Sequence, residues 1–154
     1  MKCLINFIAV FGIILTTHAT LSAQNVWKGG TPGQEQEWNN PKNWSQNRIP
    51  GIDDMVLIPN TESRGGFYPV VNGEAGPIYY LEVQGGATLS INQNGRLTID
   101  GMGKYEDAIL LIGTIVNHGE IQISADKGQM VAGHPESLLN AGQISVASPR
   151  ANKY

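Results

Sequence analysis

Cysteine is almost absent from this chain of 154 residues, and the one present, Cys3, lies near its start. A disulfide within the chain and a metal site made of several cysteines are therefore excluded. Aromatic residues make up only 7% of the chain, so large aromatic contacts must be concentrated in a few places. Positive charge is also scarce, with 10 lysines and arginines against 13 acidic residues, and we expect no nucleic-acid partner.

Residues 1–23 are expected to be a signal peptide. Lys2 precedes an apolar run that ends in small residues, and the run is too short and too interrupted to span a bilayer. Cleavage is expected after Ala23, with Ala19 as the other option, and it leaves 9 basic and 13 acidic residues. The sequence thus predicts export through the general secretory pathway to the extracellular space, the outer-membrane surface or the periplasm. No transmembrane span is expected after cleavage.

A repeat dominates the rest of the chain. An asparagine returns at intervals of 22, 23 and 23 residues, each time with a glycine one or two places later: Asn72 and Gly73, Asn94 and Gly95, Asn117 and Gly119, Asn140 and Gly142. After each glycine we expect an alternating apolar pair: Leu81 and Val83, Leu97 and Ile99, Ile121 and Ile123, Ile144 and Val146. A unit of this length cannot bury its own apolar face, so it must stack on copies of itself.

The alternation of apolar and polar residues has a period of two, which indicates β-strands, and glycine or asparagine turns separate them. A meander of hairpins would repeat its turns every ~8–12 residues. We therefore predict an all-β fold, a single-stranded right-handed parallel β-helix with coils of about 22–24 residues, with an antiparallel β-sandwich as the alternative. In the β-helix, Asn94, Asn117 and Asn140 should stack as a hydrogen-bonded ladder.

Composition divides the mature chain into three parts. Residues 24–59 hold all three tryptophans among many asparagines and prolines, and we expect them to form an N-terminal cap. Residues 60–148 are assigned to the β-helix repeats, in which the run from Ala108 to Ile112 should be a strand. Residues 149–154 are a short tail, and either this tail with Pro149 caps the solenoid poorly or the chain continues, which would make it a fragment of a longer surface protein.

The tryptophan-rich cap is the first candidate for ligand recognition. Trp38 and Trp44 offer flat apolar surfaces beside the amides of Asn40 and Asn43, a combination that suits glycan stacking. The alternative is that the rings cover the open first coil of the solenoid. Extracellular polysaccharide or cell-surface glycan is the corresponding partner.

Other chemistry has less support in the sequence. Asp53 and Asp54 are candidate calcium ligands, but their spacing matches no calcium loop, and the alternative is a turn before a strand. His118 falls between Asn117 and Gly119 in a turn. No serine lies in a nucleophile-elbow sequence. We expect neither catalytic residues nor a cofactor, and no metal beyond the calcium candidates.

The motifs of residues 27–59 resemble the opening module of secreted, adhesin-like β-solenoid surface proteins of Bacteroidota. The motifs are Trp27-Lys-Gly-Gly, Trp38-Asn-Asn, Asn43-Trp-Ser, Ile49-Pro-Gly and Asp53-Asp-x-Val-x-Ile-Pro, followed by Gly86-Ala-Thr-Leu-Ser-Ile and two Asn-x-Gly-x-Ile units at Asn117 and Asn140. The resemblance implies an exported β-solenoid, often with a C-terminal sorting domain that this sequence does not include. Trp44 to Pro59 also resembles the entry to a β-helical module of polyductin-type and hyaluronan-degrading ectodomains.

Two classes of function follow. The first is a non-catalytic secreted or cell-surface β-solenoid, used for adhesion, envelope structure or glycan contact. The second is a fragment of a carbohydrate-active β-helix enzyme, a polysaccharide lyase or hydrolase. A groove with several acids, a base and exposed rings would favour the enzyme, whereas a flat face rich in threonine and asparagine would favour the first class. The oligomeric state is left open.

Overall fold

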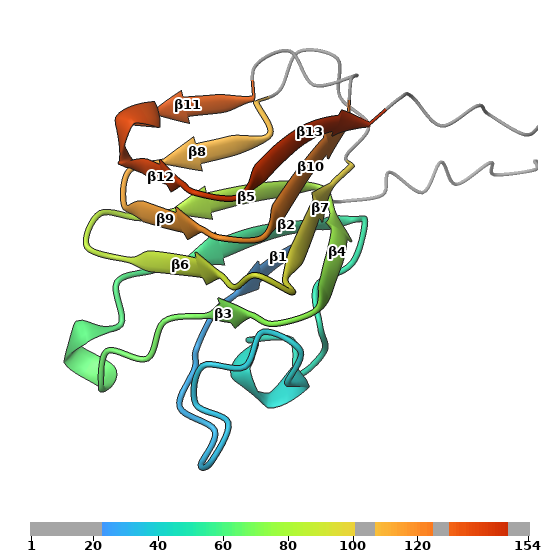
Figure 1. Cartoon of the computed structure of the whole chain (residues 1–154). Helices are drawn as coiled ribbons and strands as arrows, with labels where there is room; N and C mark the ends of the chain where they lie inside the picture. The colour runs from blue at the N-terminus through green and yellow to red at the C-terminus, as the bar shows by residue number, and fades with distance from the viewer. Residues whose placement is uncertain (1–22, 101–106, 125–129, 148–154) are drawn as a thin grey trace, which may run out of the picture.

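Every pairing between named strands is parallel in the computed structural model, which describes residues 23–100, 107–124 and 130–147. The strands form three sheets, with the orders β1-β2-β5-β8-β11, β12-β9-β6-β3 and β13-β10-β7-β4. Each coil adds one strand to each sheet in turn, and the coils rise from the blue base to the red top of Figure 1. The predicted parallel β-solenoid is confirmed, and the β-sandwich is excluded.

The strands are short and regular. The first sheet contains β1 (Ala23–Val26), β2 (Asp54–Ile58), β5 (Tyr80–Val83), β8 (Ile109–Leu111) and β11 (Val131–Gly133). The second contains β3 (Val70–Val71), β6 (Thr88–Ile91), β9 (Thr114–Asn117) and β12 (Leu138–Asn140). The third contains β4 (Glu74–Ile78), β7 (Arg96–Ile99), β10 (Glu120–Ser124) and β13 (Gln143–Ala147). Short 3-10 turns occupy Pro41–Asn43, Glu62–Arg64 and Pro135–Ser137.

Columns of apolar side chains fill the interior of the solenoid. Ala75, Leu97, Ile121 and Ile144 are partners in successive strands of the third sheet, at intervals of 22, 24 and 23 residues. This spacing agrees with the predicted coil length. Ile121 is fully buried, as predicted, and burial of one such side chain stabilises the fold by about 1.5–3 kcal/mol.

The first coil differs from the prediction in two ways. Leu81 and Val83 belong to β5 in the first sheet, so they do not follow Gly73 as Leu97 and Ile99 follow Gly95. The positions after Gly73 are instead taken by Ala75 and Ile78 of β4. The first coil also begins at β2, which lies within the range 24–59 that the sequence assigned to the cap.

The glycines keep the predicted register, but the asparagines do not all do so. The residues after Gly73, Gly95, Gly119 and Gly142 are partners in successive coils. Asn117 pairs with Asn140 above it, but its partner below is Ile91, because the turn between β6 and β7 is longer than its neighbours. Asn94 therefore lies outside the ladder, and that part of the prediction is wrong.

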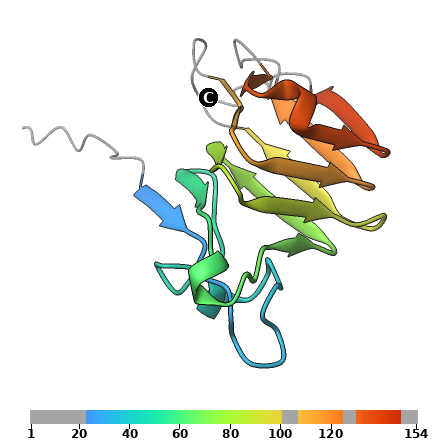
Figure 2. The same cartoon turned by 90° about the vertical axis from the view of Figure 1, so that its left-hand side faces the viewer.

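The N-terminal segment closes the base of the solenoid, at the bottom of Figure 2. Glu37 forms a parallel bridge with Val70 of β3, and Trp38 follows Glu37 as Val71 follows Val70. The indole of Trp38 is 1% exposed, and it belongs to the same apolar core as Val71. The cap thus adds one level to the bottom of the second sheet. Of the expected signal peptide, only Ala23 lies within the described residues, and the expected tail at 149–154 lies outside them.

Candidate functional site

The two tryptophans predicted to stack on a glycan are buried. Trp44 is 0% exposed and packs edge-to-face against Trp27 and Trp38, with ring centroids 4.9 and 4.7 Å away. The indole nitrogen of Trp44 donates to the Trp38 carbonyl over 2.7 Å, and that of Trp27 donates to the Phe67 carbonyl over 2.8 Å. The rings therefore present no free face to a sugar, and their arrangement matches the alternative of a packed cap.

The neighbouring amides are also used inside the cap. Asn43 is fully buried, donates to the carbonyls of Gln34 and Glu37 over 2.7 and 3.0 Å, and accepts from the backbone of Thr31 over 3.1 Å. Asn40 caps the first 3-10 turn by accepting from the backbone of Lys42 over 3.0 Å. These asparagines stabilise the loop of the cap through hydrogen bonds to its backbone.

The calcium candidates form a turn instead. Asp54 is buried, and both of its carboxylate oxygens accept hydrogen bonds from the guanidinium of Arg48. It also accepts from the backbone of Gly51 over 2.7 Å, and its own N–H donates to the Gly51 carbonyl over 2.9 Å. This pairing raises the pKa of Arg48 further. Within the described ranges, no cluster of three or more acidic, histidine or cysteine side chains is placed to hold a metal.

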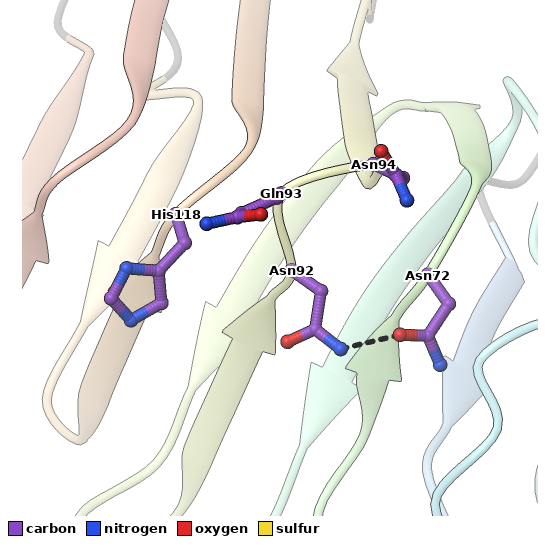
Figure 3. A pocket seen from close by; sticks show the side chains of 5 residues that line it. All are labelled: Asn72, Asn92, Gln93, Asn94 and His118. Atoms are coloured by element: carbon purple, nitrogen blue, oxygen red, sulfur yellow. Dashed lines mark hydrogen bonds between the residues drawn. The ribbon is translucent and has the colours of Figure 1, made fainter.

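A different group of polar side chains surrounds an open hollow at the corner where the second sheet turns into the third. We call it the amide corner, and it consists of Asn72, Asn92, Gln93, Asn94 and His118. The hollow has a volume of about 530 Å³, and Figure 3 shows that its lining comes from three successive coils. All five side chains belong to exposed residues.

The register of the coils explains how this corner forms. Val71, Ile91 and Asn117 are strand partners, so the residues that follow them, Asn72, Asn92 and His118, come to lie one above another. The amide of Asn92 donates to the side-chain oxygen of Asn72 over 2.5 Å. Gln93 lies next to His118 in Figure 3. Among the described residues, the side chains of Gln93, Asn94 and His118 make no hydrogen bond to the chain, so their donors and acceptors are open to a ligand.

A charged row borders the amide corner at the start of the third sheet. Arg96 lies between Glu74 and Glu120, which are its partners on the coils below and above. Its guanidinium nitrogens lie 3.5 Å from a Glu74 oxygen and 2.8 Å from a Glu120 oxygen. The hydrogen bond from Arg96, followed by that from Ser145, lowers the pKa of Glu120. This row lines a second hollow that shares Gln93, Asn94 and His118 with the first.

The sequence contained only part of the signal for this site. The sequence predicts turns at Gln93–Gly95 and Asn117–Gly119, but only as connectors between strands. Their side chains form one surface only because the coils stack with a particular register, which the two additional residues in the turn of the second coil obscure.

Comparison with protein families gives a match over most of the chain. DUF8693, a domain family of unknown function, matches residues 26–149. The chain belongs to this family. The match takes in the tryptophan cap, every strand from β2 onward and the amide corner. Comparisons of this DUF8693 member with curated proteins and with solved structures gave no match. Within its described ranges, no helix combines the length and the hydropathy that a bilayer-crossing segment needs.

Proposed function

We propose that this protein is a non-catalytic, exported β-solenoid of the adhesin-like or envelope-structural kind, and that it contacts glycans through the amide corner. One observation carries the proposal. Four carboxamides and an imidazole converge on an open hollow, and three of these side chains have no partner among the described residues. Each carboxamide can donate and accept hydrogen bonds at once, which matches the hydroxyl groups of a sugar.

The charges beside the corner favour binding over catalysis. A general acid for glycoside hydrolysis needs a carboxyl group whose pKa is raised, so that it keeps its proton near neutral pH. Glu120 has the opposite environment, because Arg96 and Ser145 lower its pKa. Glu74 also contacts Arg96, so this guanidinium serves two carboxylates. Among the described residues, no tryptophan, tyrosine or phenylalanine lines either hollow.

Glycan contact is tested by binding of the purified mature protein to an array of plant, algal and bacterial-envelope polysaccharides. We expect Gln93→Ala to weaken binding, since the Gln93 side chain lines both hollows. Gln24→Ala is the matched control, because Gln24 is an exposed glutamine on β1 in a different sheet. Equal binding by the two variants, or no binding by the unmodified protein to any glycan, would contradict the proposal.

Export is tested separately by expressing the complete chain in a bacterial host and fractionating the cells. We expect a product that begins at Gln24 and that is recovered outside the cytoplasm. A full-length product that stays in the cytoplasm would contradict this part of the proposal and leave glycan contact unaffected.

A further inference from the structure

The polar residues at the corner form a row that runs along the axis of the solenoid. Asn72, Asn92 and His118 occupy three successive coils, and successive strands in a sheet are spaced by ~4.8 Å. The cap continues the row downward, because Glu37 bridges Val70 and Asn39 follows it by two residues, as Asn72 follows Val70. We call Asn39, Asn72, Asn92 and His118 the axial row.

Side-chain contacts show that the cap and the first coil share this corner. The amide of Asn39 donates over 3.2 Å to the Glu74 carbonyl, at the start of the third sheet. The amide of Asn72 lies 3.4 Å from both carboxylate oxygens of Glu37. Glu37 and Asn39 also line a hollow of about 350 Å³ in the cap. The polar surface therefore extends from the cap through the first three coils, over ~14 Å for four levels at the strand spacing.

The charge around the axial row is negative. Glu37, Glu74 and Glu120 carry three negative charges, and among the described residues that line these hollows only Arg96 is a lysine or arginine. An acidic polysaccharide would place its own carboxylates or sulfates beside these groups, and repulsion between like charges opposes such binding. A neutral chain of sugars meets no such penalty.

These observations favour one class of ligand for the amide corner. The inference rests on the proposed function, because it names the ligand of the same site. We infer that the axial row binds an unbranched, uncharged polysaccharide that lies parallel to the solenoid axis, with sugar hydroxyls hydrogen-bonded to one polar side chain on each level. The inference also separates this surface from the active site of a polysaccharide lyase. A polysaccharide lyase acts on chains that contain uronic acids, and its active site needs cationic groups to neutralise the carboxylate of the substrate.

The test is calorimetric titration of the mature protein with oligosaccharides of two to six units. Cello-, xylo- and chito-oligosaccharides are the neutral probes, and oligogalacturonates are the acidic ones. We expect at least one neutral series to bind with an affinity that rises with chain length until the oligosaccharide spans the row. The acidic series should bind at least about tenfold more weakly at low salt, and this difference should shrink as salt screens the charges.

Two variants examine the geometry. His118→Ala removes the upper end of the row at an exposed turn, so it should weaken the longest neutral oligosaccharide about fivefold, as for one lost hydrogen bond, and the shortest less. The double substitution Glu37→Gln and Glu74→Gln removes two negative charges, so it should reduce the difference in affinity between the neutral and the acidic oligosaccharides. Gln24→Ala should change neither result.

The outcomes distinguish this inference from the proposed function. Tighter binding of the acidic series, or an affinity that does not depend on oligosaccharide length, would contradict the inference that a neutral polysaccharide lies along the axial row. Glycan contact at the amide corner survives that result if Gln93→Ala still weakens binding. Absence of binding to both series overturns the inference, and absence of binding across the polysaccharide array overturns the proposed function as well.

Discussion

The side-chain amide of Asn117 donates a hydrogen bond of 2.7 Å to the side-chain oxygen of Asn140, one coil above it. Asn117 is fully buried, and its own oxygen accepts from the backbone of Gly119 over 3.1 Å. We expect Asn117→Ala to lower the free energy of unfolding by about 1–3 kcal/mol, because the hydrogen bond to Asn140 would be lost and the partly buried N–H of Gly119 would lose its partner. Urea denaturation measures this loss. Asn94→Ala, at an exposed position outside the ladder, should stay within about 0.5 kcal/mol of the unmodified protein.

The stacked glycines allow a second comparison. A Cβ on Gly119 would collide with the carbonyl oxygens of Gly95 and Asn92, whereas a Cβ on Gly73 would meet no atom within 4 Å. We expect Gly119→Ala to destabilise the protein by about 1–3 kcal/mol or more, since backbone atoms would have to move. Gly73→Ala should be neutral or stabilise by up to about 1 kcal/mol, because alanine restricts the unfolded chain. Equal melting temperatures for the two variants would contradict the register described here.

Arg48 and Asp54 form the most buried ion pair among the described residues. The Asp54 side chain is 1% exposed, and its Oδ1 accepts from Nη2 of Arg48 over 2.6 Å. Arg48→Met would leave this carboxylate without its cation. Breaking a fully buried pair costs about 3–5 kcal/mol, and we expect about 1–3 kcal/mol because the Arg48 side chain is 48% exposed to screening solvent. Glu136→Gln, which removes the exposed pair with His134, should leave the stability almost unchanged.

The contact between Arg96 and Glu120 predicts a dependence on pH. The pKa of Glu120 is lowered in the folded protein, so its ionised form stabilises the fold at pH values above the ordinary pKa of glutamate. This contribution is lost as the pH falls through the lowered value. We expect Arg96→Gln to raise the pKa of Glu120, measured by carboxyl carbon NMR. The stability difference between Arg96→Gln and the unmodified protein should be constant near neutral pH and disappear in acid. A difference that persists in acid would show that Arg96 acts by packing.

Trp38 and Trp44 are both buried, but only one of them has a hydrogen-bonded indole nitrogen. Trp44 Nε1 donates to the Trp38 carbonyl, whereas Trp38 Nε1 has no partner among the described residues. Both substitutions by phenylalanine remove side-chain volume. At position 44 the substitution also removes a buried hydrogen bond, whereas at position 38 it removes a buried donor that has no partner. We therefore expect Trp44→Phe to lower the melting temperature more than Trp38→Phe does. The reverse order would show that the Trp38 indole has a partner in solution.

The course of the solenoid could be predicted because it depends on periodicity. The alternation in β7 and β10 and the glycine before each strand fix which residues face inward, and Ile121 follows that rule. The strand expected within Ala108–Ile112 is present as β8. Such features need only local patterns and a repeat, and both are visible along one chain.

The candidate site could not be predicted in the same way, because it depends on the relative register of turns of different length. Asn72 and Asn92 touch across two coils, although the repeat would pair Asn72 with Asn94. The tryptophans give a second example. A ring that packs a cap and a ring that stacks on a sugar have the same neighbours in sequence, and only burial distinguishes them.

The bridge between Glu37 and Val70 also indicates at which end further coils can be added to the solenoid. With the indole of Trp38 seated under the first coil, the lower end is plugged, and a duplicated coil inserted there would have to displace the plug. A coil duplicated farther along the chain would meet only another coil of the same cross-section. Lengthening by gene duplication within this family is therefore expected above the plug, and a copy of the coil that carries Asn92 would add one more polar side chain to the axial row.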